Sequence, residues 1–258
     1  MGLDEVIITK AIVEEFTQAF LKYSEVDVAL VGGGPANLVA AKHLAERGIK
    51  TALFEKKLSV GGGMWGGGMM FPRIVVQEEA RHILDDFGIS YREYQEGYYV
   101  ANSVESVGKL ISGATSAGAE FFNLVNAEDV MIRDDDTICG LVINWTPVSI
   151  GGFHVDPLTV KAKVIIDGTG HEAAVCNTVQ RKIPTAFGGK KIVGEKPLCA
   201  ESGERLVVKN TLEVYPGLIV SGMAANAFAG SPRMGPVFGG MLLSGEKAAE
   251  LAISKLKS

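Results

Sequence analysis

A histidine and an aspartate stand one residue apart in the stretch GGFHVDPLTV, at positions 154 and 156. Both side chains can carry a proton or bind a metal ion. The residues around them are typical of a β-strand, in which positions i and i+2 point to the same face. We therefore expect His154 and Asp156 to face one reaction site. Each also has a simpler explanation, since a lone histidine is often a surface residue and an aspartate before a proline often starts a turn.

A second histidine, His171, follows the turn DGTG. It could simply cap the helix that comes next. Together, His154, Asp156 and His171 match the arrangement of two histidines and one carboxylate that binds iron(II) and leaves coordination positions open for a substrate. These residue types favour a metal site, although they do not decide whether His154 is a ligand or a proton carrier.

A glycine turn near the N-terminus indicates where a nucleotide would bind. In DVALVGGGPANLVAAKHLAERGIKTALFEKK, we predict a strand over 26–31, a helix over 35–47 and a strand over 51–55. Gly32 and Gly34 allow the backbone to approach a pyrophosphate at the helix N-terminus, and Glu55 can accept hydrogen bonds from a ribose. Asn37 stands where a third glycine is usual. Strand, turn, helix, strand and acid together predict dinucleotide binding.

The other segments fit one α/β domain. We predict an amphipathic helix over 4–22 with one buried stripe, since Ile8, Ile12, Phe16 and Phe20 recur every four residues. A closing helix is expected over 239–256. KAKVIIDGTG and YPGLIVSGMAAN resemble strands of the glutathione-reductase-like fold, a Rossmann-type, FAD/NAD(P)-binding fold of three layers. The chain should form a single nucleotide-binding domain over 1–258 with an inserted β-rich lobe at about 75–160.

Composition excludes several classes of partner. The net charge of −5 leaves no basic surface for nucleic acid. No apolar run approaches the roughly 20 residues of a membrane span. The three cysteines form no CxxC pair, so a cytoplasmic location is expected.

The late segment YPGLIVSGMAAN indicates whether the ligand is a flavin. In flavoproteins of this fold, an aspartate usually follows the glycine of that segment and binds the flavin. Here Met223 follows Gly222. The fold is therefore expected to be flavoprotein-like while its ligand is not a flavin.

The chain resembles the thiazole synthase family of thiamine biosynthesis, in its archaeal and bacterial, sulfide-dependent branch. The motifs that carry this resemblance are EVDVALVGGGPANL, GGGMWGGGMMF, FHVDP, DGTGHE and, most specifically, SPRMGPVFGGMLLSG. The resemblance implies an enzyme, a transferase acting on NAD as a substrate. It implies removal of nicotinamide, condensation with glycine and sulfur to an ADP-linked thiazole carboxylate, assistance by iron(II), and assembly as a homo-octamer with site residues shared between subunits.

The resemblance also assigns residues. Asp156 and His171 would be metal ligands, Arg233 would bind the glycine carboxylate, and His154, Asp156 and His171 would be the catalytic residues. The nucleotide would be bound by Gly32, Gly34, Ala36, Glu55, Lys56, Gly63, Ala127, His154, Val155, Asp156 and Met223, with residues 154–156 reaching the site of a neighbouring subunit.

The source of sulfur follows from one position. In the family's eukaryotic branch, a cysteine two residues before the metal-binding aspartate gives up its sulfur, and this chain has His154 there. Sulfide from outside is therefore expected. Two rival functions stay open: an FAD-dependent oxidoreductase on the same fold, and a non-catalytic module that senses NAD or stores iron.

Overall fold

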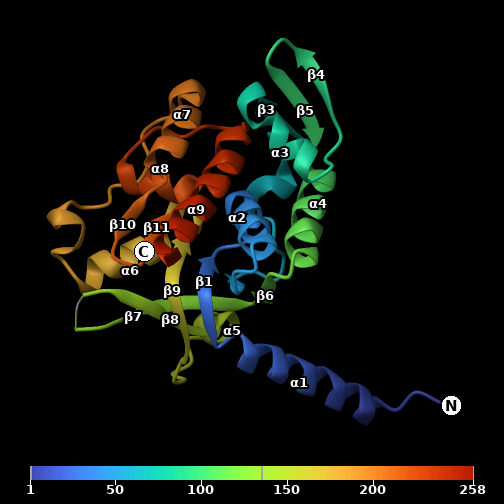
Figure 1. Ribbon diagram of the computed structural model, residues 1–258, viewed down its shortest axis with the longest axis vertical. Helices are drawn as coiled ribbons and strands as arrows, with labels where there is room; N and C mark the ends of the chain where they lie inside the picture. Colours follow the sequence, from blue (N-terminus) through green and yellow to red (C-terminus); the bar gives the residue numbers. More distant parts are fainter. Residues whose placement is uncertain (1, 135, 258) are drawn as a thin grey trace.

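A parallel β-sheet forms the centre of the computed structural model, which describes residues 2–134 and 136–257 (Figure 1). Its parallel strands lie in the order β11, β9, β1, β2, β6, and β10 pairs antiparallel with β11 at one edge. These strands are β1 (Glu25–Val31), β2 (Thr51–Glu55), β6 (Glu120–Asn123), β9 (Leu158–Asp167), β10 (Glu213–Tyr215) and β11 (Leu218–Val220). The predicted α/β, Rossmann-type fold is confirmed.

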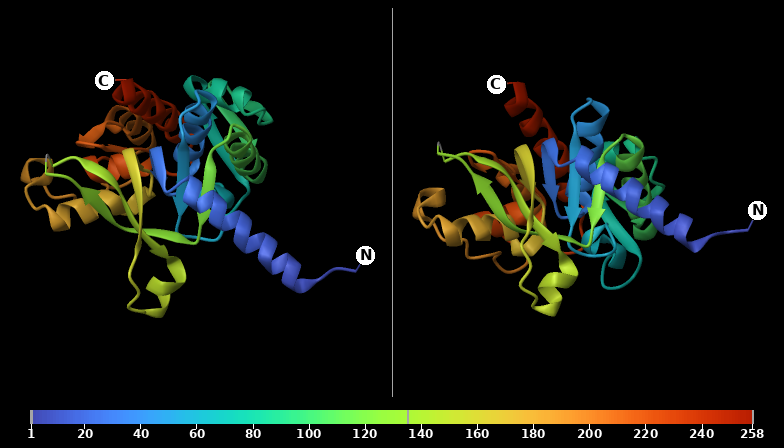
Figure 2. Two further views of the ribbon diagram at one scale, coloured as in Figure 1. Left: turned by 60° about the horizontal axis from the view of Figure 1, so that its bottom comes forward. Right: turned by 90° about the horizontal axis from the view of Figure 1, so that it is seen from below.

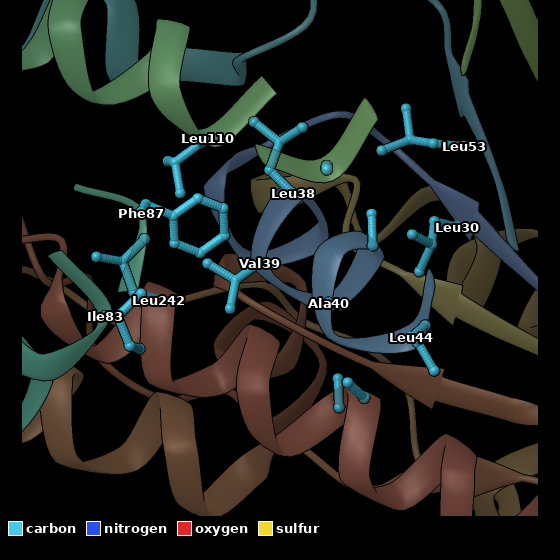
Figure 3. Packing of buried hydrophobic residues seen from close by; sticks show 14 of the residues in the cluster. Leu30, Leu38, Val39, Ala40, Leu44, Leu53, Ile83, Phe87, Leu110 and Leu242 are labelled. Carbon is cyan, nitrogen blue, oxygen red and sulfur yellow. The ribbon is translucent and has the colours of Figure 1, made fainter. Parts of the chain in front are cut away.

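Side chains of a strand alternate between the two faces of the sheet, and apolar side chains of the central strand are buried on both faces. Val28 and Leu30 of β1 enter one apolar cluster, and Ala29 and Val31 enter another. The first cluster is closed by helices α2 (Pro35–Glu46), α4 (Ser103–Ser116) and α9 (Gly239–Lys257), as Figure 3 shows. The second is closed by α6 (Ala174–Lys182), α8 (Met223–Ala229), β7 (Val125–Ile132) and β8 (Ile138–Trp145). The result is three layers.

The middle of the chain contributes to more than one of these parts. Strands β3 (Arg73–Gln77), β4 (Tyr91–Gln95) and β5 (Tyr98–Asn102) form a separate antiparallel sheet in the order β3, β5, β4. Within 75–160, the range expected as an inserted lobe, β6 joins the parallel sheet and β8 pairs with both β7 and β9. The remaining elements are α3 (Arg81–Asp86), α5 (Thr146–Gly151), α7 (Ala200–Asn210) and the 3-10 helices Gly62–Gly66, Glu78–Ala80, Gly170–Glu172 and Ala186–Gly189.

Helix α1 (Glu5–Lys22) forms as predicted, but its stripe is not buried within the chain. Asp4 caps the helix by accepting hydrogen bonds from the backbone of residues 6 and 7. Ile8, Ile12 and Phe16 are 43, 65 and 41% exposed. Only the C-terminal end touches the body, where Phe16 and Phe20 contact the ring of Phe122. The helix otherwise projects from the molecule in each view (Figures 1 and 2).

The expected strand around His154 is also wrong. Residues 153–157 have no regular secondary structure, and β9 begins only at Leu158. The physical reason is the pairing partner: the ladder between β8 and β9 ends at Ile143 and Leu158, and Pro157 has no N–H to extend it. His154 and Asp156 therefore lie in an exposed connection, which we call the limb (residues 150–157).

No helix of residues 2–134 and 136–257 is long and apolar enough to cross a membrane.

Candidate active site

A cavity of about 670 Å³ opens at the carboxyl ends of the parallel strands. This is where ligands bind in open α/β sheets, and the volume lies within the range of small-molecule pockets. Its walls include the turn after β1, the end of β2, the glycine-rich stretch after β2, the turn after β9, the start of α8 and the segment before α9. The predicted residues that line it are Gly32, Gly34, Ala36, Glu55, Lys56, Gly63, Ala127, His171, Met223 and Arg233.

The turn between β1 and α2 presents a helix N-terminus to this cavity. Gly34 is the N-cap of α2, with no side chain to occupy the free backbone N–H groups, and Pro35 begins the helix. Gly32 has φ of +88°, and a Cβ there would lie 2.7 Å from the carbonyl oxygen of Gly168. Glycine is therefore required by both the backbone conformation and the close approach of the turn after β9.

Glu55 is buried and holds this turn in place. One carboxylate oxygen accepts from the N–H of Gly33 at 2.7 Å, and the other from the N–H of Lys57 at 2.8 Å. Each oxygen keeps a second lone pair. The predicted contact with a ribose is thus compatible with the structure, but Glu55 also has a structural role that the motif did not reveal.

Asn37 is the residue that sequence reasoning treated only as a departure from the glycine pattern. It is fully buried, and its amide donates to the carbonyls of Val31 and Gly32 at 3.0 and 2.9 Å. Its carbonyl accepts from the Ser221 hydroxyl at 2.7 Å. Asn37 therefore joins the end of β1 to the end of β11, where Gly222 and Met223 line the cavity. The only feature of the sequence that pointed to a role for Asn37 was its position in the glycine motif.

The turn after β9 is organised by Asp167. Its carboxylate accepts from the N–H and hydroxyl of Thr169 at 3.0 and 2.7 Å and from the N–H of Cys176 at 3.0 Å. Burial, with Asp167 nearby, raises the pKa of the Cys176 thiol well above its ordinary value. Cys176 is therefore an inert packing residue, and the turn carries His171 into the cavity wall.

An ion pair and a hydrogen bond join segments of the cavity wall near His171. Lys56 Nζ lies 2.5 Å from a carboxylate oxygen of Glu172, joining the end of β2 to the turn after β9. His171 Nδ1 bonds to the carboxylate of Glu195, a residue that sequence reasoning did not select. Glu195 is separated from His171 by 24 residues in the chain, and no motif connects the two.

The limb lies apart from these residues. His154, Val155 and Asp156 are all exposed and do not line the cavity of their own chain. Within residues 2–134 and 136–257, no group of three or more histidine, cysteine, aspartate or glutamate side chains is placed to hold a metal ion. The structure thus brings His171 and Arg233 to the same cavity as the turn between β1 and α2 (residues 32–34), which we call the nucleotide turn. It does not bring Asp156 to His171 within one chain.

Comparison with known proteins decides the family. A family model described as the Thi4 family matches residues 9–238. The chain belongs to the Thi4 family. It is 71% identical to the thiamine thiazole synthase of Methanococcoides burtonii, over 99% of this chain and all of that protein. It is 54% identical to the thiamine thiazole synthase of Methanothermobacter thermautotrophicus, over the full length of both.

A solved structure agrees with this assignment. The crystal structure of Thermovibrio ammonificans THI4 covers 100% of both chains with a TM-score of 0.95 and 52% identity. The predicted family is therefore confirmed, and with it the prediction that the chain is an enzyme.

Proposed function

We propose that this thiamine thiazole synthase makes an ADP-linked thiazole carboxylate from NAD, glycine and sulfide, with release of nicotinamide and assistance from iron(II). One observation carries the proposal. A single cavity has a nucleotide turn at one wall, and Arg233 and His171 line it as well. This arrangement supplies a place for a pyrophosphate, a cation for a small carboxylate and a ligand for a metal ion.

The nucleotide half of NAD would occupy the wall formed by β1, α2 and β2. The N-terminus of α2 offers free N–H groups and the positive end of the helix dipole to the pyrophosphate. Glu55 ends β2, Lys56 follows it, and both line the cavity, so they would contact the ribose and the phosphates. Met223, at the start of α8, offers only an apolar surface where a flavin would need an acidic partner.

Arg233 would bind the glycine carboxylate. Its backbone is fixed, because its N–H donates to Lys196 O at 3.2 Å and its carbonyl accepts from Cys199 N at 3.0 Å. A planar guanidinium on a fixed backbone can bind a carboxylate through two parallel hydrogen bonds. The segment SPRMGP would thereby select a small anion.

Iron(II) would be held by His171 of one chain and Asp156 of another. His171 lines the cavity, whereas the limb exposes Asp156 together with large apolar side chains: Ile150 is 82%, Phe153 68% and Val155 52% exposed. A limb of this kind fits insertion into a second copy, as part of a homo-octamer. When bound, the metal would polarise ligands and hold sulfide beside the nucleotide. His154 would enter the same site as a proton carrier.

Sulfur would come from free sulfide. Among the residues that the structure describes, no cysteine lines the cavity: Cys176 is buried beside Asp167, Cys139 lies in β8, and Cys199 precedes α7. The position of the donor cysteine is occupied by His154. The enzyme should therefore turn over repeatedly.

Anaerobic reactions with NAD, glycine, iron(II) and sulfide test the proposal. More than one product per subunit is expected, with the intact mass of the protein unchanged. Product formed without sulfide, together with conversion of a cysteine to dehydroalanine, would contradict it. Stoichiometric FAD in an extract of the purified protein would instead favour an oxidoreductase.

A further inference from the structure

We propose that Glu195 is a positioning residue that fixes the orientation of the His171 ring, so that Nε2 is the nitrogen offered to the metal ion. This inference rests on the proposed function for the identity of the ligand. Its structural part, the orientation of the ring, is independent of any metal.

The contact itself assigns the two nitrogens. The Glu195 carboxylate bonds to Nδ1 of His171. A neutral imidazole has one N–H and one free lone pair, so a carboxylate on Nδ1 holds the proton there and leaves the lone pair on Nε2. Histidine ligands commonly donate their second nitrogen to a carboxylate, which sets the tautomer and raises the basicity of the ligating nitrogen.

The burial of the two partners differs in the way that this role requires. The side chain of Glu195 is 11% exposed, whereas that of His171 is 55% exposed. The carboxylate is therefore held within the protein while the ring reaches the cavity. A contact between two exposed side chains would not fix the orientation of the ring, because both side chains would be mobile and their charges screened by water.

The segment that carries Glu195 is tied to the loop of Arg233. Lys196, the next residue, donates its N–H to Ser231 O at 3.0 Å and accepts from the N–H of Arg233 at 3.2 Å, as a parallel bridge with Pro232. The carboxylate is thus one residue away from the backbone that positions the proposed glycine-binding arginine.

The same segment is anchored on its other side to α6, the helix that follows His171. The Gln180 side chain donates to Lys190 O at 2.5 Å and accepts from the N–H of Ile192 at 3.1 Å. Glu195 lies between these two anchors. A carboxylate on a backbone segment that is anchored on both sides can fix a neighbouring side chain without large entropic cost. Supporting residues preorganise a site in this way.

The orientation of the ring can be measured without metal or substrate. Protein with 15N-labelled histidine rings would be examined by solid-state NMR at a pH of about 8.5, roughly two units above the ordinary histidine pKa. The chain has only four histidines, and a His171→Asn variant identifies the resonance. We expect the proton on Nδ1 in the parent protein and its transfer to Nε2, the form that free histidine favours, in Glu195→Ala. A parent His171 with its proton on Nε2 would overturn the inference.

Glu201→Ala is the matched control, since Glu201 is an exposed glutamate in the first turn of α7. It removes the same charge and should leave the tautomer of His171 unchanged. Loss of the Nδ1 proton in this control as well would mean that general charge, not the contact, sets the tautomer, and would overturn the inference.

Anaerobic calorimetry with iron(II) then separates a positioning residue from a ligand. We expect Glu195→Ala to weaken binding by about 10- to 100-fold, the range for partners of metal ligands, and His171→Ala to abolish it. Affinity as high as in the parent protein, or complete loss in Glu195→Ala, would overturn the positioning role. If the parent protein binds no iron while the tautomer behaves as expected, the metal of the proposed function fails and the orientation of the ring by Glu195 stands.

Discussion

The nucleotide turn and the limb are two parts of the proposed site that differ in how far contacts within one chain bury and fix their side chains. In the turn, Glu55 and Asn37 are buried and their polar atoms bond to groups of the same chain. In the limb, His154 and Asp156 are exposed and large apolar side chains face solvent. The first region is preorganised by its own fold. The second does not line the cavity of its own chain, and under the proposed function it would contribute to the cavity of a partner chain.

The largest effect is expected where the turn is packed most closely. Gly32→Ala would place a methyl group 2.7 Å from Gly168 O and force a non-glycine residue to φ of +88°. Strain of this kind costs about 1–3 kcal/mol, before the clash is added. We expect a lower free energy of unfolding, measured by denaturant titration, and loss of NAD binding.

Gly97→Ala is the control for that change. Gly97 has φ of +77° but no atom within 4 Å of the position that a Cβ would take. It should show the conformational cost alone and bind NAD normally. Equal NAD affinity in the Gly32→Ala and Gly97→Ala variants would contradict the role of the turn.

A smaller and more selective effect is expected at Arg233. Arg233→Lys keeps the charge but loses the two parallel hydrogen bonds to a carboxylate. Hydrogen bonds to charged groups contribute about 1.5–3 kcal/mol, so the KM for glycine should rise at least tenfold. The affinity for NAD should stay within about twofold. Steady-state kinetics with each substrate varied would show this, and equal losses for both would indicate a general structural role instead.

The buried carboxyl group of Glu204 predicts a change in stability with pH. Desolvation by burial raises its pKa, while hydrogen bonds from Gln77 and the backbone of Gly240 oppose the rise. Between the ordinary glutamate pKa of about 4.3 and the raised value, the folded state binds more protons than the unfolded state. The free energy of unfolding should therefore fall as pH rises through this interval.

Glu204→Gln should flatten that slope, and Glu201→Gln, a change at an exposed glutamate, should not. Urea titrations over a pH series measure both. The same slope in the parent protein and in Glu204→Gln would show that other groups set the pH dependence.

The smallest effect on the chain's own fold is expected in the limb. Phe153→Ser removes an apolar ring that is 68% exposed. Surface substitutions of this kind usually change stability by less than about 0.5 kcal/mol. Far-UV circular dichroism and NAD affinity should match the parent protein, while product formation falls because the limb docks less well. A loss of NAD affinity like that of Gly32→Ala would show that the limb is part of the same preorganised region.

The same contrast explains what could be predicted from the sequence. The turn, α2 and Glu55 follow one another along the chain, so local pattern and spacing were sufficient. The conformation around His154 depends on where β8 stops pairing with β9. The burial of the apolar stripe of α1 depends on contacts outside the helix, and Ile8 and Ile12 have none that bury them within the chain. Neither is encoded in a local period. Glu195 was missed because its contact with His171 is between distant segments of the chain, without a motif.

The central claim is that one chain supplies the cavity and another supplies the limb, and mixing two inactive variants tests it most directly. Asp156→Asn and His171→Ala should each lower product formation by more than about 100-fold, because even partners of metal ligands cost roughly 10- to 100-fold. In hybrids, the His171→Ala chain donates an intact limb to the intact cavity of the Asp156→Asn chain.

Random assembly of equal amounts should place intact partners together at about one quarter of the sites, since each of the two contributions is intact half of the time. We predict recovery of roughly that fraction of the parent activity per site, with native mass spectrometry confirming the hybrids. A mixture of His171→Ala with the double variant should recover nothing. Hybrids that form but stay inactive would contradict the shared site.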